Sequence, residues 1–404
     1  MSEINSGVRT SRWARRISMS LFIIIALLIY SSINGYILWH IRSTLLHLHW
    51  PGQPFAWIIV FLMLAYPLGR IVESFYKCPP SSILIYLGAY YLGFMILLFT
   101  GYLIGDLFRL ISFALPKSIF QNVWGTAFGN YWRVAVFILA FMGVIMGHFN
   151  ARVLRIRSYD LTINKALKSV ESLNVVMASD IHLGTIINTN RLQKIVDTIN
   201  SLKPDIVLLV GDVVDEDVDK LIEHDMSPVL AQIKTTRGMF AVTGNHEYIS
   251  GNPQTAVKYL EEAGVKMLQD EIALIDDQLY IVGRVDRSAL QFTGVKRLRL
   301  TDLISPLDSS EPMILMDHQP FNLSEAMENG VDLQVSGHTH HGQIWPLNYI
   351  TEKIYERSWG YLRKGDTQYY VSSGAGTWGP PIRLGNVPEI VQLTLHFSQP
   401  RSNE

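Results

Sequence analysis

The sequence contains a single cysteine, Cys78, among its 404 residues. One cysteine excludes an intrachain disulfide and a cluster of thiolate metal ligands. This cysteine usage fits a reducing compartment. The sequence also lacks internal repeats, low-complexity tracts and proline-rich runs, so a fold built from repeated units is not expected.

Acidic side chains are scarce in residues 1–150, which contain three of them against ten lysines and arginines. Residues 151–404 contain 32 acidic and 24 basic side chains, so the net charge is +7 in the first part and −8 in the second. The basic part is apolar, whereas the acidic part has the composition of a soluble domain. An acidic domain without a stripe of Lys and Arg argues against nucleic acid as the main partner.

Long uncharged runs fill the first part. The run Ile17 to Trp39 has 23 residues without a charge, enough to cross about 30 Å of hydrocarbon as a helix. The alternatives for such runs are buried helices of a soluble protein and, for this first run, a cleaved signal peptide. The sequence favours an all-α region of four transmembrane helices in residues 1–150, with spans at 17–39, 55–76, 83–105 and 132–149. A linker, 151–172, and a soluble domain, 173–397, are expected to follow.

Basic side chains are unevenly divided between the two sides of the predicted membrane. Nine lie on the side of the amino terminus and four on the opposite side. Because cytoplasmic loops carry an excess of Lys and Arg, this predicts a multi-pass protein of the cell membrane with a cytoplasmic soluble domain. The basic run 152–157 fits two alternatives, contact with anionic headgroups or an exposed strand at the start of the domain.

The soluble domain alternates strand-like and helix-like segments, and Asp, His or Asn follows directly after several apolar runs. Those runs are residues 173–178, 206–210, 239–242, 313–316 and 333–335. In an open α/β sheet ligands gather at the carboxyl ends of the strands, so the side chains after these runs are expected to converge. The candidates are Asp180, His182, Asp212, Asn245, His246, His318, His338 and His340.

These residue types suit a site for two divalent cations. Such a site holds its cations about 3.5–4 Å apart and needs an anionic oxygen between them, with oxygen or imidazole ligands on either side. Asp212, which follows a glycine, is suited to bridge. Asn245 offers a neutral carbonyl oxygen, and His246 beside it is left for proton transfer or phosphate contact. Oxygen and nitrogen ligands without sulfur suit Mn, Fe or Zn.

Five motifs occur in a fixed order in the soluble domain. They are Asp180-Ile-His182, Gly211-Asp212-Val-Val-Asp215, Gly244-Asn245-His246-Glu247, a lone His318 and Gly337-His338-Thr339-His340. In type and order they resemble the motifs of calcineurin-like metallophosphoesterases, over residues 173–395. Gly342-Gln343 and the segment around Trp378 are similar to the membrane-attached bacterial branch of that family. That branch includes enzymes that cleave pyrophosphate or phosphodiester bonds in lipid precursors.

The resemblance implies an α/β fold, a four-layer α/β/β/α sandwich. It implies one metal held by Asp180, His182, Asp212 and His340, and a second held by Asp212, Asn245, His318 and His338. It also implies that His246 protonates the leaving oxygen. Two alternatives remain for Asp215: it supports the metal-binding loop, or it only stabilises the start of the following helix.

Two stretches depart from this family pattern. His341 stands where the branch usually has glycine, and either contact with substrate or simple replacement of a small residue is open to it. The stretch Arg284–Asp302 matches nothing in the family, so specificity is one role open to it. Its basic side chains fit either a phosphate headgroup or a solvated face.

The sequence therefore predicts a membrane-anchored phosphohydrolase that cleaves a phosphodiester or pyrophosphate bond by a two-metal mechanism, with a lipid-linked phosphoester as the suggested substrate. One alternative is a membrane sensor or scaffold with an inactive phosphoesterase domain, against which the complete motif set argues. Another is a transporter regulated by its soluble domain. The scarcity of charge inside the predicted spans, where Arg70 and Glu73 stand out, argues against a transporter.

Overall fold

The computed structural model divides the chain into two compact units, Met1–Met146 and Gly147–Glu404. It describes residues 2–50, 52–76, 79–114, 116, 126–168, 170–215, 218–223 and 225–398.

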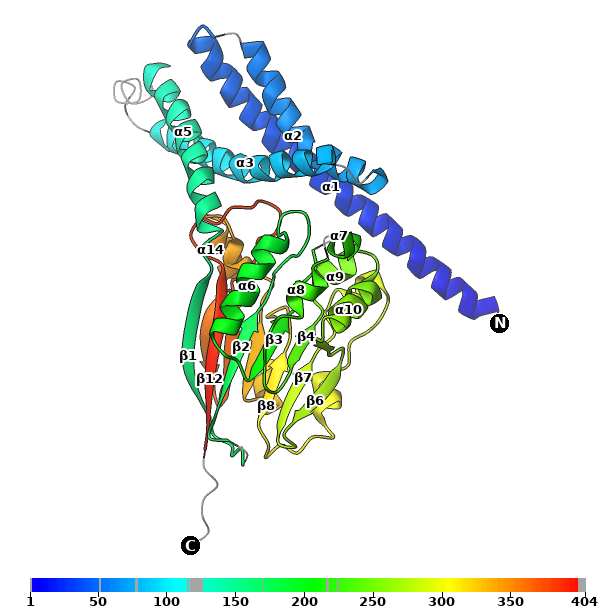
Figure 1. The fold of residues 1–404 in the computed structure, drawn as a ribbon. Coiled ribbons are helices and arrows are strands. Elements are labelled where there is room, and N and C mark those ends of the chain that lie inside the picture. The colour runs from blue at the N-terminus through cyan, green and yellow to red at the C-terminus, as the bar shows by residue number, and fades with distance from the viewer. Residues whose placement is uncertain are drawn as a thin grey trace. The chain divides into compact units, whose positions relative to one another are not determined.

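Among the described residues of the first unit, four long helices follow one another (Figure 1). They are α1 (Ser2–His47), α2 (Gly52–Phe75), α3 (Pro79–Ser112) and α5 (Thr126–Asn150), of which the last turn belongs to the second unit. Four stretches are long and apolar enough to cross a membrane, at Ile24–His47, Gln53–Phe75, Pro80–Ser112 and Gly129–Asn150. The prediction of four apolar helices ahead of an α/β domain is confirmed.

Small residues and polar side chains hold these helices together. A Cβ on Gly88 of α3 would lie 2.2 Å from the backbone nitrogen of Tyr66 in α2, so only glycine allows this close approach. A polar network joins α1 to α3 and α5. Asp106 accepts hydrogen bonds from Tyr36 Oη at 2.7 Å and from His40 Nε2 at 3.1 Å. Arg133 Nε donates to His40 Nδ1 at 3.2 Å, which completes the network.

The second unit contains two six-stranded mixed sheets. The first has the order β1 (Arg155–Ile163), β12 (Glu389–Phe397), β2 (Ser172–Ala178), β3 (Ile206–Val210), β4 (Met239–Val242) and β5 (Lys266–Met267). The second has the order β10 (Gly360–Lys364), β11 (Thr367–Val371), β9 (Leu333–Ser336), β8 (Met313–Met316), β7 (Leu279–Gly283) and β6 (Glu271–Ile275). Residues 155–163 therefore form the edge strand of the first sheet. Of the two alternatives for the basic run 152–157, this agrees with the exposed strand at the start of the domain.

The central strands of both sheets are parallel and end level with one another. Ala178 of β2 pairs with Leu209 of β3, which pairs with Ala241 of β4. In the second sheet Met316 of β8 pairs with Val335 of β9. Because parallel strands in register finish at one edge, the loops that follow them emerge side by side.

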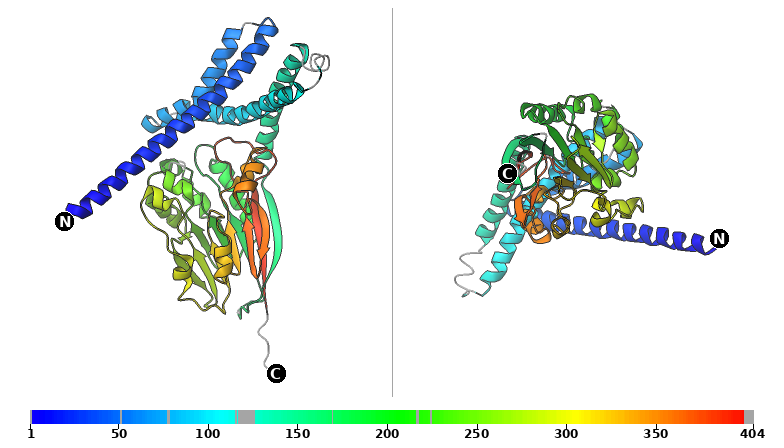
Figure 2. Two further views of the ribbon diagram at one scale, coloured as in Figure 1. Left: turned by 180° about the vertical axis from the view of Figure 1, so that it is seen from behind. Right: turned by 90° about the horizontal axis from the view of Figure 1, so that it is seen from below.

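Helices cover the outer faces of the two sheets, and one apolar core fills the space between them. That core includes Leu208 of β3 and Ile314 of β8, both fully buried. On the outer side of the first sheet lie α6 (Thr189–Ser201) and α10 (Pro253–Glu262), while α12 (Leu300–Ile304) and α13 (Ser324–Glu328) pack on the second (Figures 1 and 2). The predicted four-layer α/β/β/α sandwich is confirmed. The shorter helices are α7 (Val218–Glu223), α8 (Ser227–Leu230), α9 (Asn245–Ile249), α11 (Ala289–Phe292), η1 (His340–Gly342) and α14 (Asn348–Ile354).

Candidate metal centre

The predicted site residues, seven ligands and the proton donor His246, all follow the carboxyl ends of parallel strands. Asp180 and His182 come after β2, and Asp212 after β3. Asn245 and His246 open α9 directly after β4. The remaining three come from the second sheet, with His318 after β8 and His338 and His340 after β9. The centre therefore draws on both sheets of the sandwich.

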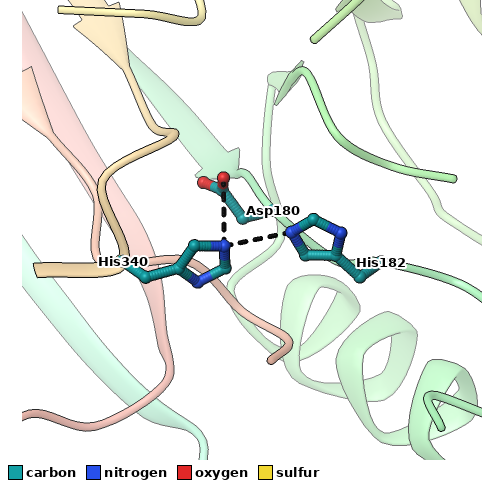
Figure 3. Close-up of side chains that lie close together, drawn as sticks. All are labelled: Asp180, His182 and His340. Carbon is teal, nitrogen blue, oxygen red and sulfur yellow. Dashed lines mark hydrogen bonds and ion pairs between the residues drawn. The ribbon is translucent and has the colours of Figure 1, made fainter. Parts of the chain in front are cut away.

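One group consists of Asp180, His182 and His340, whose side chains point toward one another (Figure 3). His340 Nε2 lies 3.0 Å from His182 Nε2 and 3.6 Å from Asp180 Oδ1. All three residues are buried, and one ligand atom from each lies within 4.8 Å of the others. This is a donor set that a divalent cation can use.

Two further groups share Asp212. One joins it to His318 and His338, and the other joins it to His182 and His246. Asp212 Oδ2 lies 3.1 Å from His318 Nε2 and 3.9 Å from His182 Nε2. Asp212 therefore lies between histidines from the two sheets.

The backbone of the ligand loops is strained. Asp180, Asp212 and His340 have φ values of +50°, +50° and +46°, in the left-handed region that side chains other than glycine rarely adopt. His182 and His338 share this conformation, with φ of +54° and +70°. Such clustering of strained residues is typical of functional sites.

Two motif glycines make room for the carboxylates. A Cβ at Gly244 would lie 2.1 Å from Asp212 Oδ1, and one at Gly337 would lie 2.3 Å from Asp180 Oδ2. Side chains at these positions would displace the carboxylates, which explains why the motifs contain glycine there.

Backbone amides fix the two carboxylates in place. Asp180 accepts hydrogen bonds from the His338 amide at 2.9 and 3.1 Å, and Asp212 accepts one from the His246 amide at 2.8 Å. The buried Glu247 carboxylate accepts from the amides of Gly244 and Val214 at 2.7 and 3.0 Å. Glu247 thereby ties the loop after β3 to the loop after β4.

Burial and neighbouring charges set the protonation of the centre. Burial alone would raise the pKa of Asp212, but His318, His246 and His182 together outweigh it and hold this pKa well below its usual range. Burial would lower the pKa of His318, whereas Asp212 raises it well above the usual value. Burial and the nearby His318 lower the pKa of His338 to about 3, and burial and His182 lower that of His340. His338 and His340 are thus neutral, as metal ligation requires, whereas His318 beside Asp212 holds a proton that a bound cation would displace.

Asp215 contacts two histidines of the site. Its Oδ1 lies 3.3 Å from His182 Nδ1 and 3.1 Å from His246 Nδ1. Burial opposes ionisation of His246, but the close Asp215 carboxylate and the charge of Asp212 raise the pKa of His246 to about 9. Of the two roles open to Asp215, these contacts favour support of the site.

The donor set fits divalent cations. The Oδ1 atom of Asn245 is buried and has no hydrogen-bond partner among the described residues. An unsatisfied buried amide oxygen in the loop after β4, directly before His246, is a natural ligand for a cation. The centre therefore has the oxygen and nitrogen donors that Mn, Fe or Zn accept.

In the stretch Arg284–Asp302, the basic side chains of Arg287, Lys296 and Arg299 are exposed, as the solvated-face alternative predicts, whereas Arg284 is buried and Arg297 is partly buried. Arg297 Nη1 donates to Asp317 Oδ1 at 3.2 Å, and Arg284 Nη1 donates to Glu325 at 3.1 Å. Both arginines pair with carboxylates in the interior, and Arg284 is only 2% exposed. They hold the loop before His318 instead of facing solvent or a phosphate.

His341 packs into the protein. Its Nδ1 lies 3.0 Å from Ser358 Oγ, and its ring lies against Trp359. Its φ of +46° lies in the left-handed region that glycine adopts more readily than histidine.

Sequence reasoning missed three residues at the centre. The ring of Trp378 lies 5.8 Å from that of His246. Arg383, fully buried, places Nη2 3.2 Å from His340 Nδ1, and Asn386 Nδ2 donates to the His340 carbonyl at 2.9 Å. The segment around Trp378 is similar to the membrane-attached branch, but nothing in its sequence indicates that Arg383 and Asn386 reach His340.

A family model described as calcineurin-like phosphoesterase matches residues 173–342. An uncharacterized metallophosphoesterase of Aquifex aeolicus is 33% identical, over 63% of this chain and 98% of that protein. Another from Helicobacter pylori is 30% identical, over 84% of this chain and 97% of its own length. A transmembrane protein with a metallophosphoesterase domain from Danio rerio is 29% identical, over 84% of this chain and 80% of its own.

A dimetal phosphatase from Danio rerio with a solved structure is 13% identical, with a TM-score of 0.33, over 56% of this chain and 99% of that one. Fold, ligand groups and relatives together define a metallophosphoesterase. The chain belongs to the calcineurin-like phosphoesterases.

Proposed function

We propose that the protein is a membrane-attached phosphohydrolase that uses two divalent cations to cleave a phosphodiester or pyrophosphate bond of a lipid-linked substrate. The observation that carries the proposal is the sharing of Asp212 between ligand groups from the two sheets. Asp180, His182, Asp212 and His340 would hold one cation. Asp212, Asn245, His318 and His338 would hold the other.

When bound, such cations lower the pKa of a water molecule and neutralise charge on the phosphoryl oxygens. The chain's own residues supply orientation and a proton. His246 Nδ1 faces Asp215, which leaves Nε2 for the substrate. Because its pKa is raised to about 9, His246 carries a proton at neutral pH and can donate it to the leaving oxygen.

The membrane part supports a substrate held at a bilayer. Four helices are apolar enough to span one, and a relative is named as a transmembrane protein. The excess of basic side chains on the amino-terminal side supports a multi-pass protein of the cell membrane with its catalytic domain in the cytoplasm.

Hydrolysis by the purified, manganese-loaded full-length protein tests this function. Bis(p-nitrophenyl) phosphate serves as the soluble substrate, and nucleotide-linked diphosphate lipids in mixed micelles serve as lipid substrates. We expect His246→Ala to lower kcat by about 10²- to 10⁴-fold, the usual contribution of general acid catalysis, with metal content unchanged.

The matched control is His396→Ala, because His396 is half-exposed and contacts only the carboxylate of Asp160 among the interactions described for it. Equal kcat values for the His246 variant and the wild type would remove the proposed role of His246. Absence of turnover on lipids together with turnover of the soluble diester would remove the lipid assignment alone.

A further inference from the structure

Large apolar side chains lie exposed on the second unit beside the metal centre. They are Trp345, Tyr349, Ile350, Ile354 and Trp378, named here the apolar rim, and each is between 43% and 58% exposed. Exposed apolar residues that cluster in one region mark a surface that interacts with another protein, a ligand or a membrane.

The helix α14 contributes three of these side chains. None of its residues, all of which the structure describes, is buried. At 3.6 residues per turn, Tyr349, Ile350, Lys353 and Ile354 project within an arc of about 140°. This side of α14 therefore presents one aromatic, two aliphatic and one basic side chain. Such a combination is typical of a helix that lies at a membrane interface.

The rim is rigidly joined to the catalytic loops. Gln343, three residues after His340, accepts a hydrogen bond from the Trp378 amide and donates one to the Trp378 carbonyl, both at 2.9 Å. A Cβ on Gly342 would lie 2.3 Å from the Asn348 amide, so α14 begins in direct contact with the loop that follows the histidines. Whatever the rim binds is therefore held next to His246 and His340.

The same loops are bonded to the end of an apolar helix. The last turn of α5, which belongs to the second unit, accepts a hydrogen bond at the Gly147 carbonyl from the Arg383 amide at 2.9 Å. Asn150 Nδ2 donates to the carbonyls of Arg383 and Asn386 at 3.0 and 2.8 Å. Between these two residues, the Leu384 carbonyl accepts the Trp345 amide at 2.9 Å.

These bonds relate the rim to the end of the apolar stretch of α5. The apolar stretch of α5 ends at Asn150, and an exposed Arg152 follows. If α5 crosses a bilayer, the hydrocarbon ends near Asn150, so the loop 383–386 lies at the level of the headgroups. Trp345 is bonded to that loop, and tryptophan is the side chain enriched at this level.

We propose that the apolar rim inserts into the headgroup region of the bilayer that α5 crosses, so that the metal centre opens toward the membrane surface. The occupant is the bilayer itself. The proposal rests on the proposed function through its membrane attachment, and it restricts the substrate to a phosphoester positioned among lipid headgroups.

Site-specific fluorescence in the full chain tests the insertion. The single cysteine is replaced with Cys78→Ser, and Ile350→Cys, Ile354→Cys or Leu274→Cys is added and labelled with a nitrobenzoxadiazole dye. The proteins are reconstituted into vesicles of phosphatidylcholine and phosphatidylglycerol that contain a headgroup spin label. Leu274, on β6, is 48% exposed and serves as the control.

We expect blue-shifted, spin-quenched emission from positions 350 and 354 and water-like emission from position 274. Equal quenching at all three positions would overturn the proposal. A blue shift that needs no lipid and grows with protein concentration would assign the rim to a second copy of the chain, and would overturn the proposal as well.

A double variant, Ile350→Glu with Ile354→Glu, separates docking from chemistry. We expect turnover of a lipid phosphoester in vesicles to fall by about tenfold or more, because two isoleucines no longer enter the apolar phase. Turnover of bis(p-nitrophenyl) phosphate should stay at the wild-type level. Equal loss on both substrates would show that the rim only supports the site. If the wild-type protein hydrolyses neither substrate, the proposed function fails while the fluorescence result still decides the docking.

Discussion

Asn386 offers a sharp test of how the ligand loop after β9 is held. Its Nδ2 donates to the carbonyls of His340 and His341 at 2.9 and 3.0 Å, and its Oδ1 accepts from Arg383 Nη1 at 3.1 Å. Both histidines have a φ of +46°, a conformation that costs about 1–2 kcal/mol per residue. The asparagine thus holds the carbonyls of two strained residues, one of which is a proposed ligand.

Asn386→Ala removes these three hydrogen bonds. Leaving a buried polar group unsatisfied costs about 1–3 kcal/mol. We take about 2 kcal/mol of this cost to destabilise the conformation in which His340 binds metal. Because 1.4 kcal/mol corresponds to a factor of ten, the Kd for Mn²⁺ should then rise by about 30-fold. Competition with a fluorescent chelator measures this Kd without depending on activity.

Asn200→Ala is the matched control. Asn200 Nδ2 donates to the Gln232 carbonyl at 2.8 Å and its Oδ1 accepts from the Lys234 amide at 2.7 Å, at the end of α6. It should lower thermal stability with the Kd for Mn²⁺ unchanged. If Asn386→Ala lost as much stability as this control but bound Mn²⁺ as tightly as the wild type, the positioning argument would be refuted.

Three further outcomes follow from the same geometry. As pH rises through about 9, His246 loses the proton that its raised pKa retains, so kcat should fall there, and Asp215→Asn should move this fall in a pH–rate profile to lower pH. A chelator should abolish hydrolysis, and Mn²⁺ or Zn²⁺, but not Ca²⁺, should restore it, because calcium prefers sites made of oxygen ligands alone. Arg297→Ala, which leaves the buried Asp317 with only the longer ion pair to Arg284 at 3.8 Å, should lower the free energy of unfolding in urea by up to about 3–5 kcal/mol. The exposed pair of Arg299 and Asp302 gives a control in which Arg299→Ala should change stability little.

The central strands and the residues that follow them could be predicted from the sequence because the pattern is local. Ile206–Val210 is uniformly apolar, as a strand covered on both faces must be, and Gly211-Asp212 ends it at once. The structure brings the side chains after these strands together. Their individual roles as ligands or acid stay predictions.

Long-range contacts could not be predicted in this way. Arg383 and Asn386 reach His340 across more than 40 positions, and neither lies in a periodic segment that would show which way it faces. The edge strand β1 pairs with β12, at the other end of the domain. In the first unit, His40, Asp106 and Arg133 lie near the ends of apolar runs, and nothing in each run alone indicates that the three meet.

The loops that form the centre come from both sheets, and buried side chains hold them in place by hydrogen bonds. Glu247 holds together the loops of the first sheet, after β3 and β4. Asn386 holds the loop after β9, in the second sheet, and its own backbone is held by Asn150 at the end of α5. A shift between the sheets would change the distance from Asp180 to His340, because these ligands come from different sheets. The bond from Asn150 therefore joins the last turn of α5, within the second unit, to the residues that hold the His340 loop.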